Sequence, residues 1–309
     1  MKPTAKTVLT VTLLLGTGTG GIAAEPTSPK VRVGRVDSEA SSTKLSREQG
    51  VPLAAFIQVA DGLFCGSEPK TEADFAWLAQ QGVRTLVSVD GVQPNLELAN
   101  QYHLRYVHIP LRYQGVSRSQ HLLLAAFADT SSEPTYVHCH HGQHRGPTAA
   151  AILGLLQGQL SRTAAIDVLR TAGTSRNYPG LWNSVRQWQP IKASETMPIL
   201  SSSVKPQPMT DSMAEIDRFY DQVAHHFKND SEVNWLRLSS DTQWLLDSLT
   251  EFRRMHSSES SRFRALSDEA KKRAAELRAA VSKQDTDAAT SKITLLGKTC
   301  VKCHTRFRN

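Results

Sequence analysis

A cysteine and an arginine lie six positions apart in the middle of the chain, in surroundings that suit chemistry on phosphorus. Cys139 ends an apolar run that predicts a strand, and Arg145 begins a stretch of small residues that predicts a helix. A loop that ends at a helix N-terminus presents several unpaired backbone N–H groups to one point. Arg145 adds a planar fork of donors suited to phosphate oxygens. Because these donors and the helix dipole favour the nucleophilic thiolate of Cys139, the segment predicts transfer of a phosphoryl group onto sulfur.

The segment from His138 to Arg145 has the pattern His-Cys-x5-Arg. It resembles the signature of the cysteine-dependent protein phosphatases, and its surroundings resemble the dual-specificity branch. The resemblance implies that Cys139 attacks phosphorus while Arg145 and the loop amides hold the equatorial oxygens. Water would then hydrolyse the cysteinyl-phosphate. The implied phosphate-binding residues are His140, His141, Gly142, Gln143, His144 and Arg145.

The same loop is rich in histidine, and His-rich segments can bind metal ions. His138, His140, His141 and His144 form this alternative together with Cys139. In the resembled loop, the side chains between the cysteine and the arginine splay outward while their N–H groups point inward. That geometry argues against a shared metal ion.

The resemblance also implies a general acid, usually an aspartate, roughly 25 to 32 residues before the cysteine on the loop after a strand. In this chain that window contains no acid, and Gln114 lies where the acid is expected. A glutamine can orient water but cannot donate a proton as an acid does. Asp90 and His108 are the substitutes that the sequence offers, whereas Asp129 is too close to the cysteine in sequence.

A second departure follows Arg145, where the family commonly has a Ser or Thr that donates a hydrogen bond to the cysteine sulfur. This chain has Gly146 there, and Thr148 lies on the wrong turn unless the loop adapts. Both departures predict a slow phosphatase, or a domain that binds phosphate without turnover. The loop histidines either add positive charge below about pH 6.5 or simply face solvent.

A second motif, Cys300-x-x-Cys303-His304, lies close to the C-terminus. This is the attachment pattern of c-type haem. Positions i, i+3 and i+4 share one helical face, so two thiols can form thioethers while the imidazole binds iron. A thiol–disulfide pair and a zinc half-site remain open as alternatives.

The ending Cys-x-x-Cys-His-x-x-Phe-Arg resembles that of the class II cytochromes c, the cytochrome c′ group. The resemblance covers about a hundred residues. It implies one covalent haem c with His304 as the proximal ligand and a distal side lined by the first helix of a bundle. Met213 or Met209 could supply a sixth ligand, or Met213 is merely a core residue. Without a sixth ligand the iron would be open to a diatomic gas.

The elements that must hold these motifs alternate between strands and helices in the first half of the chain. Such alternation predicts an α/β phosphatase-like domain with a mostly parallel central sheet flanked by helices, and places Cys139 at the carboxyl end of a strand. Thr71 is expected to cap the first helix, with Asp74 at the capping-box position. The expected strands are a hairpin around Asp61-Gly62, then 84–89, 105–111 and 136–139, and the expected helices include 71–81, 95–102, 119–128, 148–157 and 161–171. Beyond them, four apolar stripes at helical spacing predict an all-α four-helix bundle.

Composition divides the chain of 309 residues further. A positively charged start, a short apolar core and small residues before Glu25 predict a secretory signal and hence a periplasmic protein without a stable membrane span, with an uncleaved anchor as the alternative. The net charge of +7 comes without a dense basic tract, so nucleic-acid binding has little support. The expected segments are a signal peptide at 1–24, a flexible lead at 25–50, the phosphatase-like domain at 51–190, a linker at 191–208 and the haem domain at 209–309.

Three functional hypotheses follow. The first is an exported, haem-containing phosphatase that acts on a phosphorylated substrate and is regulated by haem redox state or gas binding. The second is an electron-transfer or gas-sensing cytochrome, with a redox partner, whose first domain only docks phosphorylated molecules. The third is a haem protein with a structural α/β partner domain. A homodimer is plausible from the resemblance to class II cytochromes.

Overall fold

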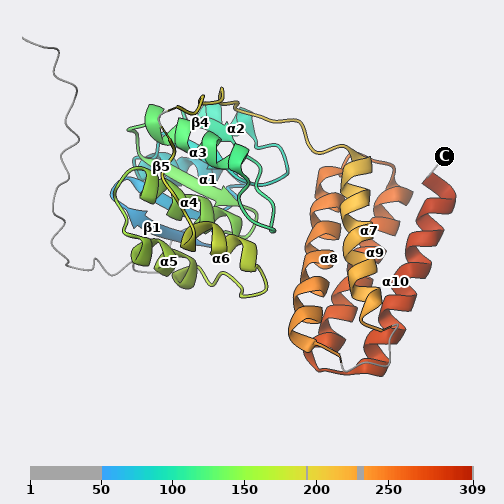
Figure 1. Cartoon of the computed structure of the whole chain (residues 1–309). Coiled ribbons are helices and arrows are strands. Elements are labelled where there is room, and N and C mark those ends of the chain that lie inside the picture. Colours follow the sequence, from blue (N-terminus) through green and yellow to red (C-terminus); the bar gives the residue numbers. More distant parts are fainter. Residues whose placement is uncertain (1–50, 193, 228–232, 308–309) are drawn as a thin grey trace, which may run out of the picture. The chain divides into compact units, whose positions relative to one another are not determined.

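The computed structural model describes residues 51–192, 194–227 and 233–307. The predicted signal peptide and flexible lead lie outside these residues. The first half of the described chain contains a five-stranded sheet with the order β1-β2-β5-β3-β4, and the second half contains only helices (Figure 1). None of the described helices is long and apolar enough to cross a membrane.

The sheet is mixed, and β5 lies at its centre. All neighbouring strands are parallel except β1 and β2, which form the hairpin predicted around Asp61-Gly62. Gly62 has a φ of 63°, a conformation that glycine adopts without strain. The strands are β1 (Phe56–Ala60), β2 (Leu63–Ser67), β3 (Thr85–Ser88), β4 (Arg105–His108) and β5 (Thr135–Cys139).

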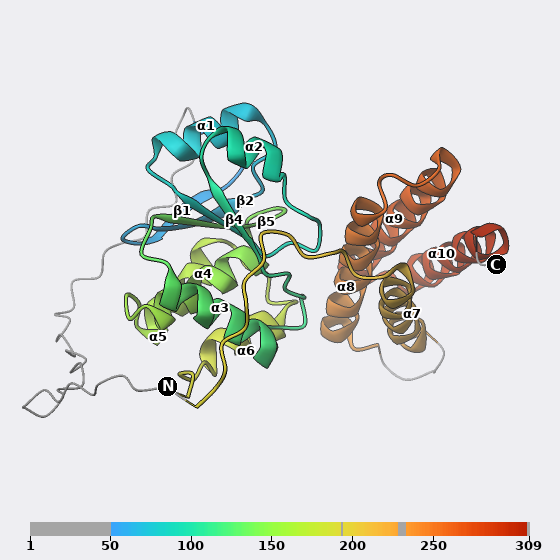
Figure 2. The same ribbon diagram turned by 90° about the horizontal axis from the view of Figure 1, so that it is seen from above.

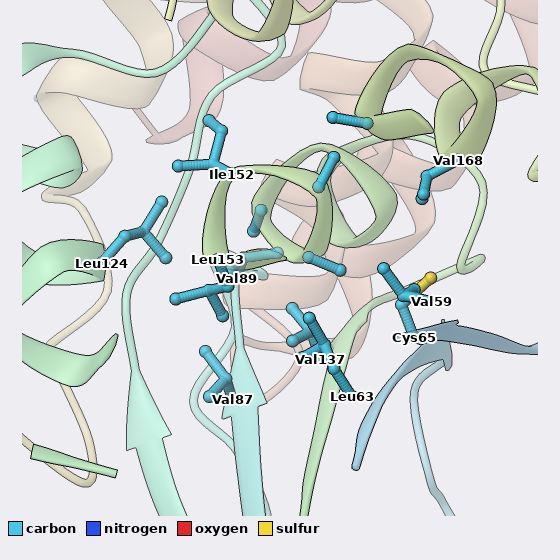
Figure 3. Packing of buried hydrophobic residues seen from close by; sticks show 14 of the residues in the cluster. Val59, Leu63, Cys65, Val87, Val89, Leu124, Val137, Ile152, Leu153 and Val168 are labelled. Carbon is cyan, nitrogen blue, oxygen red and sulfur yellow. The ribbon is translucent and has the colours of Figure 1, made fainter. Parts of the chain in front are cut away.

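Helices cover both faces of the sheet, as Figure 2 shows. One face packs against α1 (Glu72–Gln80) and α2 (Leu96–Gln101), and the other packs against the remaining helices of this half. Alternate strand residues point to opposite faces, so Val87 and Val137 meet Ile152 and Leu153 on the second face (Figure 3). The helices of that face are α3 (Arg118–Thr130), α4 (Arg145–Leu156), α5 (Arg162–Thr171) and α6 (Pro179–Arg186).

The predicted linker contains a segment that runs along the outer edge of β4. The His108 N–H donates to the carbonyl of Ser201 over 2.8 Å, and the Val204 N–H donates to His108 Nδ1 over 3.0 Å. Leu200 is partly buried against the core of the second face. Residues 200–204 therefore cover backbone groups that an edge strand would otherwise leave unpaired.

The helical half has the four helices that the apolar stripes predict, and each packs against the next in sequence. Their buried residues form one core that includes Phe219, Leu245, Leu277 and Leu296. The helices are α7 (Met209–His225), α8 (Trp235–Met255), α9 (Ser261–Ser282) and α10 (Thr286–Phe307). The predicted fold class, an α/β domain followed by an all-α bundle, is thus confirmed.

Candidate functional site

The loop between Cys139 and Arg145 has the predicted strand–loop–helix setting, because β5 ends at Cys139 and α4 begins at Arg145. Gly142 has a φ of 72°, and a Cβ on it would overlap the backbone of Gly66 and Ser67 at the end of β2. Only glycine avoids both the strained φ and this overlap. The loop is therefore pressed against the neighbouring strand, and its path is fixed at that point.

Three residues from the first half of the chain contact the Arg145 side chain. Its Nη1 donates to the carbonyl of Leu111 over 3.3 Å, and its Nη2 lies 3.5 Å from Asp90 Oδ2. Its guanidinium carbon lies 4.4 Å from the centre of the Tyr113 ring, a cation–π distance. Arg145 is thus positioned before any phosphate binds.

Asp90 lies on the turn that follows β3. Its Oδ1 accepts from the Val92 N–H over 3.1 Å, and His108 Nε2 lies 2.8 Å from its backbone carbonyl. Burial alone would raise the pKa of the Asp90 carboxyl, but the Arg145 guanidinium holds that pKa below its ordinary value. An ionised Asp90 orients Arg145 and is not suited to act as the missing general acid.

His108 is not suited to that role either. Its Nδ1 accepts from the Val204 N–H, so the ring proton is on Nε2 and points to the Asp90 carbonyl. Burial lowers the pKa of His108, which keeps the ring neutral. Both ring nitrogens are therefore occupied by backbone partners.

The loop that carries Gln114 packs against the beginning of α6. A Cβ on Gly180 would overlap the Gln114 carbonyl, and the Val116 N–H donates to Ser184 Oγ over 2.9 Å. The contact with Arg145 from this loop is made by Tyr113, whose ring stacks on Tyr178 with centroids 4.8 Å apart. The structure therefore places the Gln114 loop beside the candidate site, with Tyr113 as the residue facing Arg145.

Sequence reasoning missed Tyr113 and Tyr178 as parts of this site. The only sequence signal for Tyr113 was its position next to Gln114, in the window where the resembled family has its acid. Tyr178 gave no such signal, because its contact with Tyr113 depends on how α6 packs.

The histidines around the loop point to different partners. His138 Nε2 lies 2.9 Å from Tyr106 Oη, and His140 Nδ1 lies 2.8 Å from Glu68 Oε2. His144 instead packs against the Tyr178 ring. Within the described residues no three His, Cys, Asp or Glu side chains converge as a metal site would require.

His144 also bears on the expectation that loop histidines add charge. Burial, followed by the nearby Arg145, lowers its pKa to about 4. Burial likewise lowers the pKa of His138 to about 4. Neither ring is protonated near neutral pH, so neither compensates for a missing acid there.

Gly146 and Thr148 lie as the sequence suggested. A Cβ on Gly146 would be 3.5 Å from Cys139 Sγ, so the sulfur lies against the first turn of α4. The Thr148 hydroxyl donates to the His144 carbonyl over 2.9 Å. The hydroxyl that the resembled family directs at the sulfur therefore has no replacement in Thr148.

We expect Asp90→Asn to raise KM for a phosphate ester on the order of tenfold and to change kcat less, because Arg145 would lose the carboxylate that orients it for phosphate. Steady-state kinetics test this. Asp61→Asn, in the exposed β1–β2 turn, is the matched control and should leave both constants unchanged. A fall in kcat with an unchanged KM would contradict the role of Asp90 in orienting Arg145 for phosphate binding.

The second motif lies on the last turns of α10. Cys300, Cys303 and His304 are all half-buried, whereas Val301 between them is 65% exposed. Cys300 and Cys303 do not form a disulfide with each other. The three side chains share one face, as attachment to a porphyrin through two sulfurs and one imidazole requires.

The neighbouring surface of α7 suits a flat apolar group. Met209, Met213 and Tyr220 are partly buried and pack against the same core as Cys300. Gly297, one turn before Cys300, leaves room for the Tyr220 hydroxyl, which a Cβ there would overlap. The residues present thus fit a c-type haem, with Met213 on α7, the helix that the resemblance assigns to the distal side.

Two family models match separate parts of the chain. Residues 58–177 match "Swiss Army Knife protein, DSP-PTPase phosphatase domain", and residues 201–308 match "Cytochrome C'". Both families were expected from the two cysteine motifs. A search of the curated proteins finds no significant match.

Solved structures resemble the first domain. A crystal structure described as "Putative phosphatase (DUF442)", from Shewanella putrefaciens CN-32, is 22% identical, covers 44% of this chain and 90% of that chain, and has a TM-score of 0.37. The core catalytic domain of the PP-IP phosphatase SIW14 from S. cerevisiae, in complex with citrate, is 17% identical, covers 43% and 85%, and has a TM-score of 0.37.

Proposed function

Because the chain joins a DSP-PTPase phosphatase domain to a cytochrome c′ domain, we propose that it is a haem-containing phosphatase. The first domain would hydrolyse phosphate monoesters through Cys139. The observation that supports this most is the fixed loop between β5 and α4, with Arg145 already oriented by Asp90 and Leu111. Donors held in place before the reaction stabilise charge that develops on the phosphoryl oxygens.

The proposed reaction has two steps. The Cys139 thiolate attacks phosphorus, forming the S–P bond as the ester P–O bond breaks and the alkoxide leaves. Water then attacks the cysteinyl-phosphate, which releases inorganic phosphate and restores the thiolate. Arg145 and the loop amides bind the equatorial oxygens in both steps. The buried Cys65 is not a competing nucleophile, because burial raises the pKa of its thiol far above the ordinary value.

The missing carboxylic acid at Gln114 predicts a strong dependence on the leaving group. An aryl phosphate releases a stable phenolate without a proton donor, whereas an alkyl phosphate needs one, so we expect alkyl esters to react about 10²–10⁴-fold more slowly. Phosphate release from both esters by the haem-loaded protein measures this ratio. Aryl phosphate turnover no faster than in Cys139→Ser protein would remove the enzymatic proposal altogether.

A second candidate function is phosphate binding without turnover, which Gln114 and Gly146 favour. In that case the protein would be an electron carrier or gas sensor that docks phosphorylated partners. Vanadate or phosphate that binds to the Cys139 loop in a protein that hydrolyses no ester would select this function.

For the second domain we propose one haem c, attached through Cys300 and Cys303 with His304 as the proximal ligand. The haem would supply electron transfer or gas binding, and either could regulate the first domain. The residues proposed to hold it lie on one half-buried face of α10. Export through residues 1–24 would bring the chain to the periplasm, where bacterial c-type haem is attached. A redox partner and a homodimer are further parts of this proposal.

We expect the haem-loaded protein to be coloured. If Met213 is only a core residue, the sixth position of the iron is open, and carbon monoxide should change the absorption spectrum of the reduced protein. Met213→Leu, which keeps the apolar volume, should then leave the spectrum unchanged. A spectrum that does not respond to carbon monoxide in the native protein but responds in Met213→Leu would instead identify Met213 as the sixth ligand.

A further inference from the structure

A polar pocket of about 850 Å³ lies next to the Gln114 loop, outside the candidate phosphate site. Its walls are the loop from Arg112 to Ser117, the first turn of α3 and the exposed side of α6, and Ile152 of α4 also lines it. Cys139, Arg145 and Tyr113 are not among its lining residues. The volume is in the range of small-molecule binding sites. Nothing in the proposed reaction uses this pocket.

The charge of the pocket has one sign. Its lining residues, all within the described part of the chain, include Arg112 and Arg118 but no aspartate or glutamate. Glu195, which does not line the pocket, accepts from Arg118 at its rim. A carboxylate of the chain itself thus occupies Arg118 through two hydrogen bonds, and an anionic ligand that binds this arginine would take the place of Glu195. Clustered positive charge in a concave surface raises the local concentration of anions.

The remaining lining side chains are suited to hydroxyl groups. Side-chain amides line the wall at Gln114, Asn183, Gln187 and Gln189. Gln120 and Ser184 also line it, but they already form hydrogen bonds with Pro110, Ser117, Gly180 and Val116. Two further lining residues, His121 and Trp188, are partly buried. A ligand that matches these groups brings both an anion and several hydroxyls.

We propose that this pocket binds a small organic phosphate that carries hydroxyl groups, separately from the site at Cys139. The arginines would hold the phosphate and the amides would hold the hydroxyls. Because the Gln114 loop is one wall of the pocket and also carries Tyr113 against Arg145, an occupant would restrict the loop that borders the phosphate site. The proposal does not depend on turnover at Cys139.

The test is calorimetric titration of the full-length, haem-loaded Cys139→Ser protein with glucose 6-phosphate as the probe. Glucose and inorganic phosphate are titrated in parallel. Glucose 6-phosphate should bind more tightly than either. Gln187→Glu adds a carboxylate to the pocket wall and should weaken binding about tenfold or more. Gln101→Glu makes the same change on the exposed surface of α2 and should have no effect.

A second variant separates the pocket from the phosphate site. In the Cys139→Ser background, Arg145→Lys weakens binding of phosphate esters at the Cys139 loop, so glucose 6-phosphate that still binds to this double variant reports the pocket, and its affinity there should be unchanged. Binding that is lost in Arg145→Lys but retained in Gln187→Glu would place the sugar phosphate at the Cys139 loop and overturn the proposal. Absence of binding to the Cys139→Ser, Arg145→Lys protein, or inorganic phosphate that binds to it as tightly as the sugar phosphate, would also overturn it. None of these outcomes decides whether the first domain is a phosphatase, because no hydrolysis is measured.

Discussion

Arg145→Lys protein is expected to hydrolyse an aryl phosphate about 10²–10³-fold more slowly than the native protein, mainly through kcat. Lysine keeps the charge but loses the planar fork that binds two phosphoryl oxygens at once. It also loses the geometry that Asp90 and Leu111 impose on the guanidinium. A lysine ammonium group would still attract the phosphate of the bound ester. It could not form the two parallel hydrogen bonds that stabilise the phosphoryl oxygens in the transition state.

The measurement is kcat and KM for an aryl phosphate at one pH, with vanadate inhibition as a second readout. Arg105→Lys is the matched control, because Arg105 is exposed at the start of β4 and far along the strand from the loop. It should behave as the native protein. Equal rates in Arg145→Lys and the native protein would mean that Arg145 does not contact the reacting phosphoryl group.

The second large effect is expected from Gly142→Ala, which should remove vanadate binding and turnover together. The added methyl group would overlap the backbone of Gly66 and Ser67, and neither backbone can withdraw without disturbing β2. The φ of 72° adds a strain of about 1–2 kcal/mol for any residue with a Cβ. The loop must therefore move, and its N–H groups no longer converge on one point.

Gly82→Ala separates the two contributions. Gly82 has a φ of 82°, but a Cβ on it would meet nothing within 4 Å. This variant should lower the midpoint of urea unfolding through backbone strain alone and keep vanadate affinity and activity. If Gly142→Ala also kept its vanadate affinity, the loop amides would not be the phosphate donors.

Much of the architecture could be predicted from the sequence, because it depends on interactions between residues that are close together in the chain. Thr71 caps α1 with Asp74 as a complete capping box, because the two residues satisfy each other's backbone within one turn. The Asp61-Gly62 hairpin likewise needs only a turn and two short strands. The Cys139 loop was predictable because its strand, glycine and helix are contiguous in sequence.

The parts that could not be predicted depend on contacts between distant segments. Asp90 and Arg145 are 55 positions apart, and their ion pair exists only because β3 and β5 are neighbours in the sheet. The sequence offered Asp90 as a substitute acid, and only the structure shows its carboxylate directed at Arg145. Tyr113 under Arg145 and the pocket beside Gln114 likewise depend on the packing of α6.

The segment at 200–204 has a practical consequence for any attempt to isolate the first domain. A truncated chain that stops at Pro190, where composition suggests the domain ends, would strip the outer border of the sheet of its hydrogen-bonding neighbour. Exposed borders of this kind recruit other chains and promote aggregation. The truncated chain would also lose Leu200 from the core and the partner of His108 Nδ1. A truncation that is meant to keep these contacts should therefore extend at least to Val204.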